Sequence, residues 1–186
     1  TTDNALDTTQ GFRWFTSLDP AYAFGDTTGQ FVAASTEGRA YLGVASDKLV
    51  FAGRLKAGSV YGASVDDLPS DRRFYAGGGG SVRGFGYQGI GPLDDDGSPS
   101  GGRSLLEGSV EARWRASRKF GVALFVDGGE VGAAEIPHFA DLRLGAGLGM
   151  RYFTRFGPLR LDLAAPIDRR EGDDPFLVYI SIGQAF

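Results

Sequence analysis

The chain has 186 residues, of which 30 are glycine, and its hydrophobic (42%) and aromatic (12%) content is too high for a disordered chain. Nineteen Lys and Arg against 23 Asp and Glu give a net charge of −4, which argues against a general nucleic-acid binder. The absence of cysteine and the single histidine exclude disulfide scaffolds, thiol catalysis and a multi-histidine metal site in one copy.

Alternation of apolar and polar residues with period two runs through most of the chain and predicts an all-β fold. In the first segment Phe12, Trp14 and Leu18 alternate with Arg13 and Ser17. Successive side chains of a strand point to opposite faces, so each such segment has one apolar and one charged face. The pattern predicts eight strands, at 9–19, 28–45, 48–62, 103–117, 119–131, 140–154, 158–165 and 176–186.

The later strands carry the clearest alternation. Leu159, Leu161 and Leu163 alternate with Arg160 and Asp162. In a transmembrane barrel the apolar face meets lipid and the charged face lines the lumen. The residues predicted to line the lumen and to pair there are Arg39, Arg54, Lys56, Arg113, Arg115, Arg143, Arg151 and Arg160 with Glu37, Glu107, Glu111, Asp127, Asp141 and Asp162. Inward glycines that would let a loop lie close to the wall are Gly121, Gly129, Gly145, Gly147, Gly149 and Gly183.

The connections between predicted strands alternate in length. Short connections at 45–48, 117–119 and 154–158 alternate with long ones at 20–27, 63–102, 132–139 and 166–175. An even number of strands with short turns at one end and long loops at the other is typical of outer-membrane β-barrels, with both termini on the periplasmic side. A soluble β-sandwich is the alternative, but it would not sort its loops by length.

Two motifs in the long loop 63–102 could be mistaken for ligand sites. Gly84, Gly86 and Gly89 fit a GxGxxG pattern, but a dinucleotide site needs a helix directly afterwards, and 90–92 (Ile-Gly-Pro) cannot begin one. The acidic run 94–96 invites a calcium interpretation, but Pro99 stands where such a loop needs glycine, which favours a solvated turn. We expect no cofactor and no metal.

Catalysis would depend on His138, which lies at a junction between a loop and a predicted strand. An outer-membrane hydrolase would need a nucleophile beside this base, but the sequence has no G-x-S-x-G motif. We therefore predict no catalytic residues and no enzymatic activity.

The centre of the long loop carries a family resemblance. It contains the sequence Val82, Arg83, Gly84 and Phe85, which is similar to the VRGF/Y signature of the outer-membrane assembly superfamily. The wider segments 74–92, 102–107, 125–129 and 178–186 match as well. The chain resembles the C-terminal half of the barrel of TamA/BamA-type assembly factors, also called bacterial surface antigen or POTRA-barrel proteins, and it is most similar to the TamA branch.

The resemblance implies a fold and a site. The family barrel has sixteen strands, and this chain corresponds to the last eight as one outer-membrane β-barrel domain over 1–186. In the family the signature loop folds into the lumen, which implies contacts of Arg83 with Glu111 and Asp127; the alternation places both acids on the lumen face. The last strand resembles the insertion signal of outer-membrane proteins, with Tyr179, Ile180, Ile182, Gly183 and Phe186 as its residues.

The resemblance also implies a function. Family members in the bacterial outer membrane insert or translocate client outer-membrane proteins, autotransporters in the TamA branch, through a seam between the first and last barrel strands. The partners implied are outer-membrane lipid and client proteins. Two alternatives are a two-partner-type secretion pore of the same superfamily and a passive structural or pore-forming barrel.

The eight predicted strands leave two edges that a bilayer does not tolerate unpaired. The first strand can pair with the last in a closed eight-stranded barrel, or two copies can join edge to edge in a sixteen-stranded ring with two-fold symmetry. We favour the closed monomer and keep the homodimer as the alternative.

Overall fold

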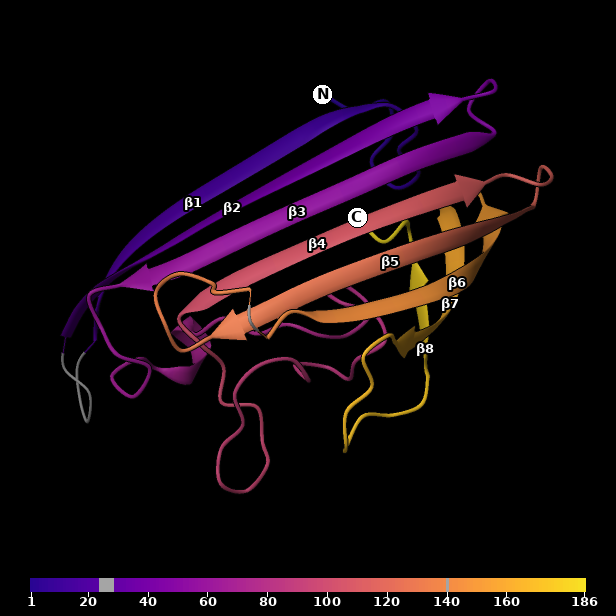
Figure 1. The fold of residues 1–186 in the computed structure, drawn as a ribbon. Helices are drawn as coiled ribbons and strands as arrows, with labels where there is room; N and C mark the ends of the chain where they lie inside the picture. Colours follow the sequence, from indigo (N-terminus) through magenta and orange to yellow (C-terminus); the bar gives the residue numbers. More distant parts are fainter. Residues whose placement is uncertain (24–28, 140) are drawn as a thin grey trace.

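The computed structural model describes residues 1–23, 29–139 and 141–186, which form one antiparallel sheet of eight strands in sequence order (Figure 1). The strands are β1 (Gly11–Ala23), β2 (Gly29–Val44), β3 (Leu49–Tyr61), β4 (Ser104–Trp114), β5 (Phe120–Gly132), β6 (Arg143–Thr154), β7 (Gly157–Pro166) and β8 (Leu177–Ile182). A short 3-10 helix, η1 (Ser70–Arg72), lies in the long loop. Within the described ranges, no helix has the length and apolarity needed to cross a membrane.

All eight predicted strands are present, and their boundaries differ most at the two edges of the sheet. β1 runs on through Pro20, which pairs with Val32; an edge strand tolerates a proline because one side of it carries no ladder. β8 ends at Ile182 because Gly183 has a φ of +92°, outside the β region. Predicted strand positions 28 and 140 lie outside the described residues.

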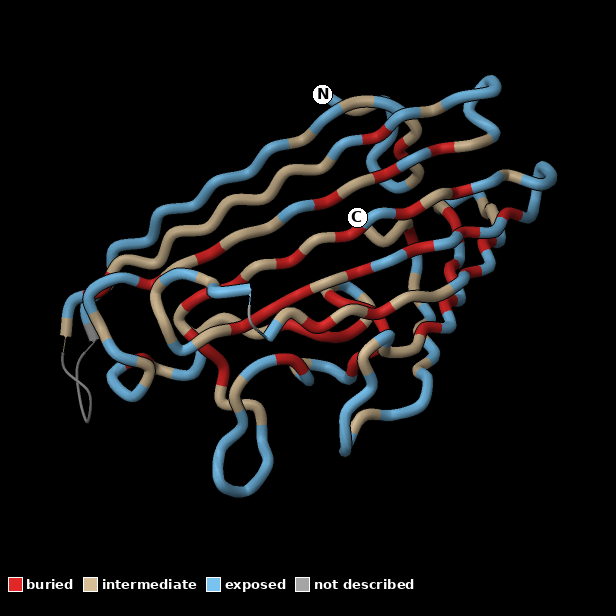
Figure 2. The backbone as a smooth tube through the Cα atoms, viewed as in Figure 1, coloured by how far each residue is buried: buried red, intermediate tan, exposed pale blue. Residues whose placement is uncertain are grey.

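The distribution of apolar and charged side chains over the sheet is the reverse of that in a soluble protein. Leu55 and Leu124 are 61% and 64% exposed on the outer face, whereas Glu111 and Asp162 are fully buried on the inner face. The alternation of buried and exposed positions along β4 and β5 is visible in Figure 2. This distribution is the one expected of a wall with lipid on one side and a polar interior on the other.

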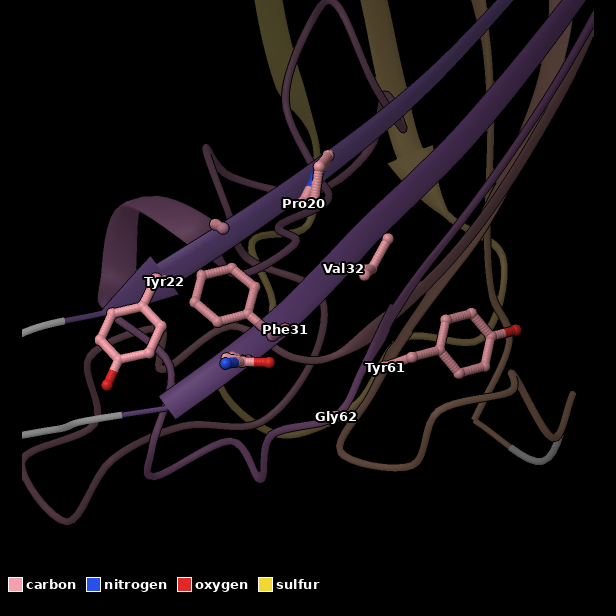
Figure 3. A pocket seen from close by; sticks show the side chains of 8 residues that line it. Pro20, Tyr22, Phe31, Val32, Tyr61 and Gly62 are labelled. Atoms are coloured by element: carbon pink, nitrogen blue, oxygen red, sulfur yellow. The ribbon is translucent and has the colours of Figure 1, made fainter.

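Exposed aromatic side chains gather towards both ends of the outer face. Trp14, Trp114 and the contacting rings of Phe120 and Tyr152 (centroids 5.2 Å apart) lie towards the end with the short turns. At the loop end, the exposed Tyr22 of β1 and Tyr61 of β3 line a hollow of about 650 Å³, and Figure 3 shows their rings there. Exposed aromatic rings at both ends of an apolar band are typical of membrane interfaces.

The sheet is open, so the closed eight-stranded barrel that we favoured from the sequence is wrong for this structure. The strand order begins at β1 and ends at β8, and no pairing joins these two strands in the part of the chain that the structure describes. An eight-stranded ring has an interior only wide enough for side chains. Here the concave side also holds the long loop, so the curvature belongs to a wider barrel.

The long loop between β3 and β4 folds against the loop end of the sheet (Figure 1). Two apolar clusters hold it there. Val82 and Phe85 pack with Leu105 and Val131 in the first, while Leu68 packs with Phe31 and Val60 in the second. The loop also pairs with itself at isolated bridges, Phe74 with Gly102 and Ala76 with Ile90. These parts of the loop are therefore packed against the sheet, whereas residues 93–98 are exposed.

Candidate functional site: the lumen loop and its acidic cradle

One loop arginine is surrounded by three wall carboxylates. The Arg83 guanidinium lies 2.7 Å from a carboxylate oxygen of Asp127, 2.8 Å from one of Glu111 and 2.9 Å from one of Asp162. All four side chains are buried. Charge-assisted hydrogen bonds of this kind are strong, and they offset the cost of removing the arginine from water.

Further contacts fix the orientation of Arg83. Its backbone N–H donates to Asp127 at 3.0 Å, so Asp127 binds both main chain and side chain of the same residue. The guanidinium carbon lies 3.3 Å from the centroid of the Phe125 ring. Ser109 donates to the other oxygen of Asp127. The cradle thus binds the arginine from several sides.

The wall strands place these groups by simple alternation. Ser109 and Glu111 are two residues apart on β4 and share the inner face. Asp127 pairs with Ser109 across β4 and β5, and Phe125 pairs with Glu111. Asp162 reaches the same cradle from β7. Alternation therefore places each of these side chains on the inner face, and the curvature of the sheet brings Asp162 of β7 to the groups of β4 and β5.

Three wall arginines surround the same acids. Arg113 lies 2.8 Å from Glu111, and Arg151 lies 3.1 Å from Glu111 and 2.5 Å from Asp162. Arg160 lies 3.3 Å from Asp162. Glu111 and Asp162 therefore have cationic partners from the wall, whereas the ion pair of Asp127 is made by Arg83 of the loop.

The wall also binds the backbone of the loop. Arg54 donates to the carbonyl oxygens of Gly80 (3.1 Å) and Ser81 (3.2 Å), and Arg160 donates to that of Gly79 (2.8 Å). From β8, the Tyr179 hydroxyl accepts from the Gly84 N–H at 3.0 Å and donates to the Phe85 carbonyl at 2.8 Å. The segment 79–85 is thus bound by side chains from β3, β4, β5, β7 and β8.

Two of the six predicted inward glycines allow the loop to approach. A Cβ at Gly145 would lie 2.0 Å from the Arg83 carbonyl oxygen, and one at Gly129 would lie 2.6 Å from Val82. Three of the other four make room for different groups: Gly121 for Phe153, Gly147 for Phe125, and Gly149 for Asp162 and Arg151; Gly183 lies near Leu6 and has a positive φ of 92°. The prediction that they all admit loop backbone is wrong for these four.

The predicted motif residues have distinct places. Val82 and Phe85 are buried in the first apolar cluster, and Gly84 has a φ of +99°, which favours glycine. In β8, Ile180 and Ile182 face outward and Tyr179 contacts the loop. These placements give each motif residue a separate structural role.

Phe186, the last residue of the predicted insertion signal, lies outside β8. Because the strand ends at Gly183, the Phe186 ring turns away from the row of Ile180 and Ile182. Its centroid lies 5.3 Å from the Arg113 guanidinium and 6.4 Å from the Tyr41 ring, and both partners are buried.

Two other predicted lumen residues also differ. Asp141 lies outside β6, its side chain is 79% exposed, and its nearest cation is Arg170 at 3.8 Å. Arg115 pairs with Asp7 of the N-terminal segment. The remaining lumen pairs include Arg39 with Glu37, Arg54 with Glu107, and Arg143 with Asp168 and Asp173.

Sequence reasoning assigned Arg83 two acids and missed the third, Asp162, and it also missed the inward ring of Phe125. Asp162 and Phe125 lie on the same face as their charged neighbours, so the alternation predicts that both side chains point inward. What it lacked was the curvature that brings β7 opposite β4. Tyr179 was noted as part of the last strand, without its contact to the loop.

The remaining motifs form no site. The acidic run 94–96 lies in a tight turn, where the Gly97 N–H donates to the Asp94 carbonyl and the Ser98 N–H to the Asp96 carboxylate. The described residues contain no group of three or more His, Cys, Asp or Glu side chains that could hold a metal ion. His138 is exposed, and its backbone N–H donates to Glu130.

A sheet with lipid-facing apolar residues and a packed charged interior defines part of a transmembrane β-barrel. A family model described as the Omp85 superfamily domain matches residues 1–186. The chain is 32% identical over 181 residues to the outer membrane protein assembly factor BamA of Nitratidesulfovibrio vulgaris, covering 93% of this chain but only 22% of that protein.

Two solved structures share the fold. BamA from Haemophilus ducreyi lacking POTRA domains 1–3 matches 96% of this chain and 39% of its own, with a TM-score of 0.74 and 21% identity. CdiB from Acinetobacter baumannii matches 90% of this chain and 31% of its own, with a TM-score of 0.59 and 19% identity.

The chain belongs to the Omp85 superfamily. It is a BamA/TamA-type barrel segment of the bacterial outer membrane, and its open sheet is that of a partial barrel.

Proposed function

We propose that this protein inserts or translocates client outer-membrane proteins without catalysing a covalent reaction. The observation that carries the proposal is the edge of β8, which has a partner only on the β7 side among the described residues. Backbone groups left unpaired in lipid cost several kcal/mol each. A strand of a client protein that adds to this edge removes that cost, and the edge is therefore a template for client folding.

The pairing of β8 supports a seam at this position. β8 pairs with β7 through six residue pairs, whereas β6 pairs with β7 through ten and β1 with β2 through thirteen. A strand with fewer pairs opens at lower free energy than its neighbours. Ile180, at the centre of β8, is 80% exposed on the outer face, so a client strand at this edge would continue the lipid-facing surface.

We assign the loop cradle a supporting role in this function. Arg83 ties loop residues 79–85 to the wall beside β8, which keeps the lumen filled while the edge remains open. Clients and outer-membrane lipid are then the partners. Action on autotransporters, as in the TamA branch, is the finer proposal.

A second candidate is secretion of a partner protein through the lumen. The support for this candidate is the fold that the chain shares with CdiB, and a shared fold does not by itself establish a shared function. Secretion requires the loop to leave the lumen, whereas insertion at the edge does not. A passive barrel is the third candidate, and it requires neither movement of the loop out of the lumen nor pairing of a client strand with the edge of β8.

The experiment uses proteoliposomes that carry the protein and an unfolded client outer-membrane protein. We expect the client to fold faster than in empty liposomes, and a client cysteine in its final strand to form a disulfide with V178C or I180C in β8. The matched control is L124C, which lies on the same lipid-facing surface in β5. Folding no faster than in empty liposomes, or equal crosslinking at position 124, would overturn the proposal.

A further inference from the structure

We infer that Tyr179 is a positioning residue that couples the lumen loop to the edge strand β8. The contact between Tyr179 and the loop is independent of the proposed function. A role of this contact in client insertion rests on the proposed function. Its hydroxyl accepts a hydrogen bond from the Gly84 N–H (3.0 Å) and donates one to the Phe85 carbonyl (2.8 Å). One side chain thus binds two consecutive peptide groups within the loop signature.

Tyr179 is the only residue of β8 with a hydrogen bond to the loop in the described part of the chain. The other side chains that bind segment 79–85 come from interior strands of the sheet, which have partners on both sides. Moving β8 therefore disturbs one attachment of the loop and leaves the Arg83 cradle in place. The loop would loosen locally, at Gly84 and Phe85.

The position of Tyr179 makes its contact with the loop sensitive to movement of β8 relative to β7. It pairs across the ladder with Asp162, which binds Arg83, so the two attachments lie side by side on neighbouring strands. The ring also covers Gly79, where a Cβ would lie 2.9 Å from its Cδ1 atom and 3.2 Å from its Cβ atom. A shift of β8 away from β7 would separate the hydroxyl from the loop.

Coupling of this kind is reciprocal. If pairing of β8 strengthens the loop contact, then the loop contact must strengthen the pairing of β8 by the same factor. A client strand that pairs with the edge of β8 and draws β8 away from β7 would loosen the loop at 84–85, and a firmly bound loop would keep β8 in place.

The first test is hydrogen exchange of Tyr179→Phe, which removes only the hydroxyl. We expect exchange of the Gly84 amide and of the β8 amides to accelerate together, each by at least about tenfold, because the variant loses both hydrogen bonds of the hydroxyl. The control is Tyr41→Phe, because Tyr41 is a buried tyrosine whose hydroxyl has no hydrogen-bond partner among the described residues. Faster exchange at Gly84 with unchanged β8 amides would overturn the coupling, as would no change at either place.

The second test is a reversible lock, the pair G79C and Y179C. The Cβ separation of 3.2 Å is near the range of a disulfide. We expect the oxidised protein to show slower exchange in β8 than the reduced form, and to lose client insertion until it is reduced. An oxidised protein with slowed β8 exchange and full insertion would leave the coupling standing and contradict the proposed function. Unchanged β8 exchange on oxidation would contradict the coupling itself.

Discussion

The two halves of the sheet share one outer face but differ on the inside. Along β2 most residues are half-buried, whereas β4 and β5 alternate between buried positions and half-buried or exposed ones (Figure 2). The inner face of β1 and β2 carries open polar contacts, such as Ser17 with Ser35 and Arg39 with Glu37. The inner face of β4–β8 carries Arg83 and its buried acids.

The loop explains the difference. Segment 79–85 lies over β4–β8 and buries their charged residues, so each of those charges needs an ionic partner. On the β1–β2 side the pairs keep water, and each contributes little. Identical alternation in the sequence therefore yields a rigid cradle in one half and a solvated wall in the other.

The largest expected effect comes from Arg83→Ala. It leaves three buried carboxylates without their loop cation, at a cost of about 3–5 kcal/mol. We expect protease to cleave the segment 63–102 much faster, measured as the rate of fragment formation in detergent. Arg39→Ala, in the open half, should change the rate less than twofold because its pair is partly solvated. Equal rates for the two variants would remove the distinction between the halves.

We expect substitutions on the outer face to have similar effects in the two halves of the sheet. Leu55→Arg in β3 and Leu124→Arg in β5 place a charge on the lipid face, and we expect each to lower the free energy of unfolding in lipid by about 2–4 kcal/mol. Denaturant titration in vesicles measures both. A large difference between them would mean that one of the two surfaces does not face lipid.

Asp162→Asn tests the third carboxylate of the cradle. It keeps the shape but removes a charge that two wall arginines and Arg83 share, so we expect a loss of about 1–3 kcal/mol. Asp141→Asn is the control, because that carboxylate is exposed and its nearest cation is 3.8 Å away. Thermal unfolding of the two variants gives the comparison, and a wild-type melting temperature for Asp162→Asn would contradict the cradle.

The smallest effect concerns the N-terminal segment beside β1. Partial burial raises the pKa of Asp3, but hydrogen bonds from the Thr9 side chain and the backbone of Gln10 and Thr9 outweigh it and lower the pKa to about 2. Because the folded pKa is depressed, the contribution to stability is complete above the ordinary carboxyl pKa of about 4 and is lost as the pH falls through about 2. We expect amide exchange at Thr9 to rise over this window, with Asp3→Asn removing the pH dependence.

Alternation predicted the strands, the charged inner face and both acids that the family resemblance assigned to Arg83. It could not predict that Asp162 joins them, because sheet curvature depends on pairings that no single strand encodes. It could not predict the turn of Phe186 away from the lipid face, because a glycine such as Gly183 accepts strand and left-handed conformations alike. The open sheet does not follow from alternation either, because the pattern along single strands does not determine how the edge strands of a partial barrel pair.

The central claim is that the loop signature lies against the inner wall. The most direct measurement is disulfide formation in the membrane-embedded protein between V82C and G129C, where a Cβ at position 129 would lie 2.6 Å from a methyl group of Val82. The account predicts a rapid intrachain crosslink for this pair and none for V82C with V126C, which places the second thiol on the outer face of the same strand. Slow or absent crosslinking at 129, or equal crosslinking at 126, would contradict it.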